Sequence, residues 1–383
     1  MTWARRAVVL LAALTLLGAG CGSGSQQTRS AAVPGPPLSL ARSVAVPGGT
    51  WAVVMMGGPI RRHDNFWELL TRPGGTHAWR LATPPGVASN GGLVIAGRGA
   101  GSVVAGFRPS QRLVFSPLAA TSDNGATWSP GLLDAGLANV PGALAADPRD
   151  GRLLALARGG NTELSVTRGG GWTRLVTLRS LAKSAAGRRC GLESVSGAAL
   201  SPSGMPLLAG TCRHRRTAGV FAFASGRWRL AGPALPAFPA GPPTRVIGLS
   251  VAGGRETALL QAGAGRGTVL WGAWSDGRAR WALSTSLPLG GAQVWSVSGD
   301  PGGSIGIVLN GRAGVTLAGP GSSWRWLPFL PPGTQTLAVG SGARVDALAA
   351  AGTTFTDWAY TSGSSSWART QTLHVPVPYG SSG

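Results

Sequence analysis

Residues 121–129 read TSDNGATWS, a turn-forming run that ends beside a tryptophan. The Asp123 carboxylate can accept hydrogen bonds from backbone N–H groups of its own turn, as Asx side chains do. Gly125 supplies a positive φ without steric cost, and Trp128 offers a large apolar surface for packing. The stretch therefore predicts a tight turn followed by an indole wedged between neighbouring structural units.

Weaker copies of this turn recur along the chain, and a tryptophan follows each copy. Consecutive tryptophans of the series are 43 to 56 residues apart. The aligned residues are Trp79, Trp128, Trp172, Trp228, Trp281, Trp324 and Trp367. Repeats of about 20–50 residues are typical of propellers and solenoids.

Each repeat has the same internal order of segments. It opens with a small apolar strand such as ALAAD (143–147), continues to a bulkier strand such as TVLWGAW (268–274), and ends in a proline-rich connector. Small side chains fit strands crowded around a central axis, and 62 glycines with 28 prolines disfavour long helices. We predict an all-β fold, a seven-bladed β-propeller of four-stranded blades over residues 43–378, closed by residues 44–50 or 372–378.

Ser122, Asp123, Gly125 and Trp128 resemble the Asp-box, or BNR repeat, of sialidase-like propellers, although Asp123 directly follows Ser122 here. In that family the box is structural and lies away from the active site. The resemblance implies a propeller and, for an active member, three arginines that clamp a carboxylate, an Asp acid/base and a Tyr nucleophile paired with Glu.

Catalytic candidates under that resemblance are few. They are Arg61, Arg62, Asp64 and Tyr360, with Glu193 or Glu256 as the partner of the tyrosine and Arg245, Arg312 and Arg344 as further cations. The order Pro-Ile-Arg-Arg-His-Asp at 59–64 departs from the family's arginine motif. The alternative interpretation places residues 61–64 in a solvated hairpin and Tyr360 in the packing of an outer strand.

The N-terminus has the layout of an export signal. Two arginines precede an apolar run at residues 7–20, and Cys21 follows Gly-Ala-Gly, which resembles a bacterial lipobox. We predict a signal peptide at 1–20, a lipidated Cys21 with a flexible tether at 21–42, and a disordered tail at 379–383. The alternative is an ordinary signal peptide with Cys21 as a spare thiol.

The formal charge of +21, or +19 without the two signal arginines, comes almost entirely from arginine, since Lys183 is the only lysine. Nucleic acid is the usual partner of such a chain. Export and the scattered positions of the arginines favour instead a solvated surface drawn to anionic lipid or anionic wall polymer.

Cys190 and Cys212 remain if Cys21 carries lipid, and an oxidising exterior favours a disulfide between them. The stretch LRSLAKSAAGRRC (178–190), which lengthens the interval between Trp172 and Trp228, is interpreted as a helical or loose insertion. The four histidines share no metal-ligand spacing, and no complete nucleotide-binding motif occurs, so we expect no metal and no cofactor.

These observations favour an exported, lipid-anchored propeller that acts as a non-catalytic binding or scaffold module for a protein or glycan at the bacterial cell envelope, as a monomer. A sialidase-like glycoside hydrolase and an assembly factor for an envelope complex are the alternatives.

Overall fold

The computed structural model describes residues 42–57, 65–84, 92–107, 117–132, 141–157, 162–165, 171–214, 217–236, 244–277, 280–340 and 344–376. All of these residues lie within the compact unit Pro36–Gly383. The described elements are strands apart from two short α-helices, α2 (Leu178–Lys183) and α3 (Ala185–Cys190), and the 3-10 turn η2 (Gly265–Gly267).

Consecutive strands pair antiparallel in groups of four, and each group is a small meander. Short contacts, Val44 with Gly299 and Thr211 with Arg245, join two pairs of these groups into larger sheets. The first groups are β1 (Arg42–Val46), β2 (Gly49–Gly57), β3 (Asn65–Pro73) and β4 (Arg80–Leu81); β5 (Leu93–Gly99), β6 (Ser102–Phe107), β7 (Pro117–Thr121) and β8 (Ser129–Leu132); and β9 (Ala143–Ala146), β10 (Leu153–Leu156), β11 (Thr162–Ser165) and β12 (Trp172–Val176).

The groups that follow are β13 (Leu192–Leu200), β14 (Pro206–Cys212), β15 (Gly219–Ala224) and β16 (Arg227–Leu230); then β17 (Thr244–Ala252), β18 (Arg255–Ala262), β19 (Val269–Ser275) and β20 (Trp281–Leu283), with β21 (Leu287–Pro288) beside β19. The last are β22 (Val294–Gly299), β23 (Ile305–Leu309), β24 (Ala313–Leu317) and β25 (Arg325–Trp326); and β26 (Thr334–Val339), β27 (Arg344–Ala351), β28 (Thr354–Thr361) and β29 (Ala368–His374).

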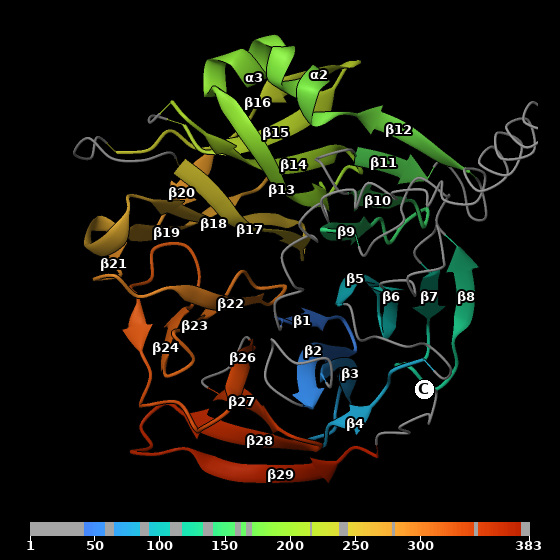
Figure 1. Ribbon diagram of the computed structural model, residues 1–383, viewed down its shortest axis with the longest axis vertical. Coiled ribbons are helices and arrows are strands. Elements are labelled where there is room, and N and C mark those ends of the chain that lie inside the picture. Colours follow the sequence, from blue (N-terminus) through green and yellow to red (C-terminus); the bar gives the residue numbers. More distant parts are fainter. Residues whose placement is uncertain are drawn as a thin grey trace, which may run out of the picture. The chain divides into compact units, whose positions relative to one another are not determined.

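The groups are arranged around a centre, and the first strand of each group lies nearest to that centre (Figure 1). This radial array is a β-propeller, the architecture that the repeat predicts. Small residues dominate some of these inner strands, as in the sequence ALAA of β9. Small side chains are needed there because neighbouring strands approach one another most closely near the axis.

The apolar core is divided into clusters, each formed where two neighbouring sheets face each other. Trp51 and Leu69 of the first group, for example, pack with Val103 and Phe107 of the second. Corresponding clusters join each later pair of consecutive groups. A further cluster joins the first group to the last and so closes the ring.

The turn at 121–129 is built around the Asp123 carboxylate. Its Oδ1 accepts hydrogen bonds from Thr127 N (2.9 Å) and Thr121 Oγ1 (2.7 Å), and its Oδ2 accepts one from Thr127 Oγ1 (2.6 Å). These bonds, those from Thr127 first, hold the pKa of Asp123 well below its usual value. Gly125 has φ +82°, and a Cβ there would lie 2.9 Å from Ala82 Cβ, so the turn packs tightly on the first sheet.

Tryptophans of the repeat connect one group to the preceding one. Trp128 of the second group meets Trp51 of the first edge to face, with ring centroids 6.1 Å apart. In three later repeats the indole N–H donates to a backbone carbonyl just beyond the outer strand of the preceding group. These bonds are Trp281 to Ala231 (2.7 Å), Trp324 to Thr285 (2.8 Å) and Trp367 to Pro328 (3.4 Å).

The contact surface between the first group and the last, called the seam below, has polar side-chain bonds in addition to its apolar cluster. Gln335 Oε1 accepts from Met55 N (2.7 Å), while the Gln371 amide accepts from Trp79 N (2.6 Å) and donates to Trp79 O (2.8 Å). The seam also has one backbone bond, from Gly57 N to Gly352 O (2.8 Å).

An ionic cluster lies beside these bonds. Buried Asp346 pairs with Arg72 of the first sheet and with Arg344 of its own strand, whose Nε lies 2.6 Å from Asp346 Oδ1. Fully buried Asp357 accepts a bond from Thr370 Oγ1 (2.6 Å). Burial, and then the nearby Asp346 charge, raise the pKa of Asp357 to about 6.

Neither of the segments expected to complete a distant sheet does so. β1 pairs with β2 through the Pro47–Gly48 turn, in which Pro47 suits the first central position and Gly48, at φ +85°, suits the second. β29 pairs with β28 of its own group. β1 makes one additional parallel contact, Val44 with Gly299 of β22, so the terminal groups are built from their own consecutive strands.

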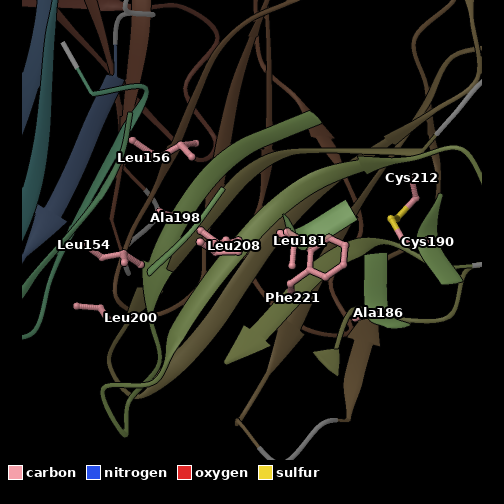
Figure 2. Packing of buried hydrophobic residues seen from close by; sticks show 12 residues of the cluster. Leu154, Leu156, Leu181, Ala186, Cys190, Ala198, Leu200, Leu208, Cys212 and Phe221 are labelled. Carbon is pink, nitrogen blue, oxygen red and sulfur yellow. A yellow bond between two sulfur atoms is a disulfide. The ribbon is translucent and has the colours of Figure 1, made fainter. Parts of the chain in front are cut away.

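The fourth group carries the predicted insertion, which is helical. Thr177 and Ser184 cap α2 and α3 through side-chain bonds to Ser180 N and Gly187 N. The predicted disulfide is present, with the Cα atoms of Cys190 and Cys212 4.9 Å apart. Figure 2 shows this bond at one end of the apolar cluster that contains Leu181 and Phe221.

Candidate functional site

A cavity of about 620 Å³ lies at the centre of the array, lined by residues of the innermost strands β1, β5, β9, β13, β17 and β22. Much of its lining is aliphatic. Half-buried examples are Ile95, Ile247, Leu249, Val251 and Val297. Covering apolar groups that face a water-accessible space lowers the free energy of the complex. The cavity therefore favours a ligand with an apolar part.

Two arginines, Arg42 of β1 and Arg245 of β17, also line this cavity. Arg42 is exposed to solvent, although the protein around the cavity partly desolvates its guanidinium and so lowers its pKa. Arginine nevertheless stays protonated in proteins. Among the described residues, no carboxylate forms an ion pair with either guanidinium.

A carboxylate, Asp300, lines the same cavity beyond the end of β22. Its Oδ1 accepts a bond from Ser304 N (2.7 Å), while its buried Oδ2 has no hydrogen-bond partner in the described part of the chain. Asp300 also borders a second hollow of about 390 Å³ beside Arg72 and Thr76. The central cavity thus has cationic and anionic groups at separate places on its wall.

A second feature lies on the outside of the molecule. Large apolar side chains exposed in the described residues are Phe329 (90%), Trp326 (54%), Trp295 (49%) and Leu81 (42%). Trp326 of β25 and Phe329 of the loop after it are called the aromatic surface below, whereas Trp295 lies on β22, the innermost strand of the same sheet.

The loop that carries Phe329 is held at several points. Its neighbours Leu327 and Leu330 are buried, and their N–H groups donate to Gly314 O (2.9 Å) and Arg312 O (3.0 Å). Trp367 donates to the carbonyl of Pro328 on the other side. Phe329 is therefore displayed on a fixed loop.

Tyr360 lies on β28, the third strand of the last sheet, and packs against Trp367 with ring centroids 5.5 Å apart. The guanidinium of Arg325 lies 5.8 Å from the centre of its ring. Tyr360 does not belong to the lining of the central cavity.

The other catalytic candidates are scattered among the described residues. Glu193 pairs with Arg213 (2.9 Å), and Glu256 is buried on β18, where burial raises its pKa. Arg344 is engaged by Asp346, and the Arg312 carbonyl braces the Phe329 loop. Arg245 is the candidate that the structure places in the cavity.

Several predicted residues and segments fall outside the described residues. They are Cys21, Arg61, Arg62 and Asp64, with the signal segment 1–20 and the tail 379–383. No group of His, Cys, Asp and Glu side chains within the described ranges is arranged to hold a metal ion. None of the described helices is long and apolar enough to cross a membrane.

The sequence interpretation did not identify Arg42 or the aromatic surface. Arg42 lies at the edge of the segment assigned to the tether. A signal for the surface was present, since LPFLPPG (327–333) places a phenylalanine among prolines, which restrict a loop to few conformations.

No protein-family model matches the chain, and no curated protein matches it. Among solved structures, YCF48 from Cyanidioschyzon merolae is 16% identical with a TM-score of 0.50, over 82% of this chain and 94% of that chain. A structure of YCF48 bound to D1 peptide is 15% identical (TM-score 0.47; 82% and 90%). A six-bladed β-propeller lectin from Aleuria aurantia that recognises fucose is 13% identical (TM-score 0.42; 90% and 100%). At 16% identity, the likeness to YCF48 from Cyanidioschyzon merolae shows the β-propeller fold alone.

Proposed function

We propose that the protein is a seven-bladed β-propeller, exported and anchored to the cell membrane by lipid on Cys21, that binds a protein partner at the cell envelope without catalysing a reaction. The observation that carries this function is the aromatic surface, with Phe329 90% exposed on a fixed loop. Aromatic residues are enriched in the core of protein interfaces, and two large aromatic side chains exposed three residues apart suit such a site.

The blade number rests on the agreement of two patterns. Each described group of four strands contains one tryptophan of the repeat or is followed by it before the next group begins. The apolar clusters link consecutive groups and then the last group to the first. Seven blades account for both patterns.

A protein partner suits the composition of the surface. Tryptophan is enriched among residues that dominate binding energy, and exposed Trp326 lies three residues before Phe329. The loop that carries Phe329 is already ordered, because the N–H groups of Leu327 and Leu330 donate to Gly314 O and Arg312 O. Surfaces ordered before binding lose less conformational entropy when a partner docks.

Site-specific crosslinking tests this function. A photoreactive phenylalanine analogue at position 329 should form a discrete adduct with a protein in native envelopes. In pull-downs from the same envelopes, the double variant that carries Trp326→Ala and Phe329→Ala should no longer recover that protein. Leu81→Ala, which removes an exposed apolar side chain from β4, is the matched control and should leave recovery unchanged. Equal losses in both variants, or no adduct at 329, would contradict the proposal.

A glycan partner is the second candidate, because exposed indole faces can stack on sugar rings. It predicts saturable binding of a soluble envelope glycan that Trp326→Ala removes. An assembly role would use the same surface on a subunit of a larger complex, and the mass of the crosslinked adduct distinguishes these outcomes.

The competing sialidase-like hydrolase requires Tyr360, a glutamate and three arginines to converge. In the described residues Tyr360 packs on Trp367, and Glu193 pairs with Arg213. Release of fluorophore from a fluorogenic sialoside, lost in Tyr360→Phe, would establish that alternative and overturn the non-catalytic function.

The lipid anchor is tested separately. Cys21→Ser should release the protein from the membrane fraction into the soluble extracytoplasmic fraction. Retention of that variant in the membrane at high salt would contradict anchoring through Cys21.

A further inference from the structure

We propose that the central cavity is a binding site for a long-chain carboxylate, whose head is held by Arg42 and Arg245 and whose chain is covered by aliphatic side chains of the innermost strands. This site is separate from the aromatic surface. It gives the protein a small-molecule ligand in addition to a macromolecular partner.

The charge of the head group follows from Arg42. Arg42 is exposed to solvent on the cavity wall, and no carboxylate in the described part of the chain pairs with it. Its guanidinium is therefore accessible to an anionic ligand. A carboxylate accepts two parallel N–H bonds from such a guanidinium.

The orientation of the ligand in the cavity follows from the register of the strands. Val44 of β1 lies opposite Gly299 of β22, so Arg42 is at the level of Val297, and Asp300 lies three residues further along. Three residues of strand span about 10 Å. An anionic head is repelled by Asp300 and is placed at the Arg42 level or beyond it.

Arg245 lies on the far side of that level from Asp300. A Cβ on Gly248 would lie 3.3 Å from Val297 Cγ1, and one on Gly299 would lie 4.0 Å from Ser250 Oγ. β17 and β22 therefore run in the same direction, and Arg245 precedes the Arg42 level by about 10 Å. The two cations together define the head-group half of the cavity.

The aliphatic lining specifies the remainder of the ligand. Ile247, Leu249 and Val251 of β17 line the cavity and are only half-buried, as is Ile95 of β5. Covering them with a methylene chain removes apolar surface from water on both sides of the contact. A small anion such as acetate has no methylene chain and therefore lacks this stabilisation.

Calorimetric titration of the full chain carrying Cys21→Ser tests the proposal, with dodecanoate as the probe. Dodecanoate should bind saturably at one site. Acetate, 1-dodecanol and dodecyltrimethylammonium separate the contributions of charge and chain, and each should bind at least about 10-fold more weakly, because each lacks the chain or the carboxylate–guanidinium bonds.

Arg42→Gln should weaken dodecanoate binding about 10-fold or more, and Arg42→Lys, which keeps the charge, should weaken it less. Arg227→Gln, on the exposed strand β16, is the matched control for loss of one positive charge and should bind as the parent does. Equal effects of Arg42→Gln and Arg227→Gln on dodecanoate binding would overturn the assignment. The absence of saturable dodecanoate binding would also overturn it, as would equally tight binding of dodecyltrimethylammonium.

Discussion

The seam and the later blade interfaces solve the same packing problem with different chemistry. Where consecutive groups meet, Trp281, Trp324 and Trp367 each donate to a carbonyl of the preceding group. At the seam, Trp79 is buried beside Phe355 of the last group, but its Nε1 has no partner among the described residues. Side-chain amides and an ionic cluster supply the polar contacts of the seam instead.

The difference follows from the order of the groups along the chain. Consecutive groups are covalently joined by short connectors, so little entropy is lost when they dock. The first and last groups have no such connector, and residues bonded across the seam are up to 294 positions apart in sequence. An interface formed from distant segments needs directional contacts that specify one register, and the Gln371 and Asp346 bonds supply them.

The largest test of this comparison is Asp346→Ala. Its removal leaves Arg72 without its buried ion-pair partner and Arg344 with only the longer contact to Asp357 (3.7 Å), so the free energy of unfolding should fall by about 3–5 kcal/mol. Asp150→Ala, which removes an exposed ion-pair partner of Arg152, should cost less than about 1 kcal/mol. Urea unfolding followed by tryptophan fluorescence measures both. Similar losses in the two variants would mean that the seam is no more dependent on charge than the surface.

The Cys190–Cys212 disulfide provides a covalent contact with which the ionic contacts of the seam can be compared. Replacing Cys190 and Cys212 by serine opens a bridge between residues 22 positions apart and should lower the free energy of unfolding by about 3 kcal/mol. Reductant should have the same effect on the parent and no effect on the double variant. This value would be contradicted if complete reduction of the disulfide left the free energy of unfolding of the parent unchanged.

The pH dependence of stability tests the ionic cluster. The pKa of Asp357 is raised to about 6 in the folded state, so its protonated form is the better accommodated one. Its contribution is present below the unfolded pKa near 4 and is lost as pH rises through about 6, a change of at most about 3 kcal/mol.

Asp357→Asn should remove that part of the pH dependence between pH 4 and 7. Comparing variant with parent at each pH cancels the titration of Glu68 and Glu256, whose pKa values are also raised by burial. Parallel pH profiles for the two proteins would exclude Asp357 as the group responsible.

The smallest effect concerns the tryptophans themselves. Trp281→Phe loses a hydrogen bond to Ala231 and should cost about 1 kcal/mol beyond its packing loss. Trp79→Phe also removes a buried N–H that has no acceptor in the described structure, which offsets part of its packing loss. Thermal unfolding should therefore show Trp281→Phe to be the more destabilising change, although Trp79 is the more buried residue. The reverse order would contradict the distinction between the two interfaces.

Much of the fold could be predicted because the repeat is written locally. Gly125, Asp123 and Trp128 act within one turn, so their spacing alone indicates the structure. The disulfide was predicted from the number of cysteines and an oxidising exterior, and the insertion from the longer interval between Trp172 and Trp228. The seam could not be predicted in this way. Gln335 and Gln371 look like ordinary surface residues until the ring brings them to Met55 and Trp79.

The candidate site was less predictable for the same reason. Arg42 and Arg245 are two of many scattered arginines, and the innermost strands bring them to one cavity. Tyr360 attracted attention through the family resemblance, while its strand position, on β28 beside Trp367, follows the packing interpretation.

The pairing of β1 with β2 and of β29 with β28 has a consequence for biosynthesis. Because each described group of four is built from consecutive strands, a polypeptide emerging N-terminus first can form each group as soon as its own residues are out. The final event is then the docking of two finished edges, and the interval before it is the time when the chain is most exposed to aggregation or proteolysis.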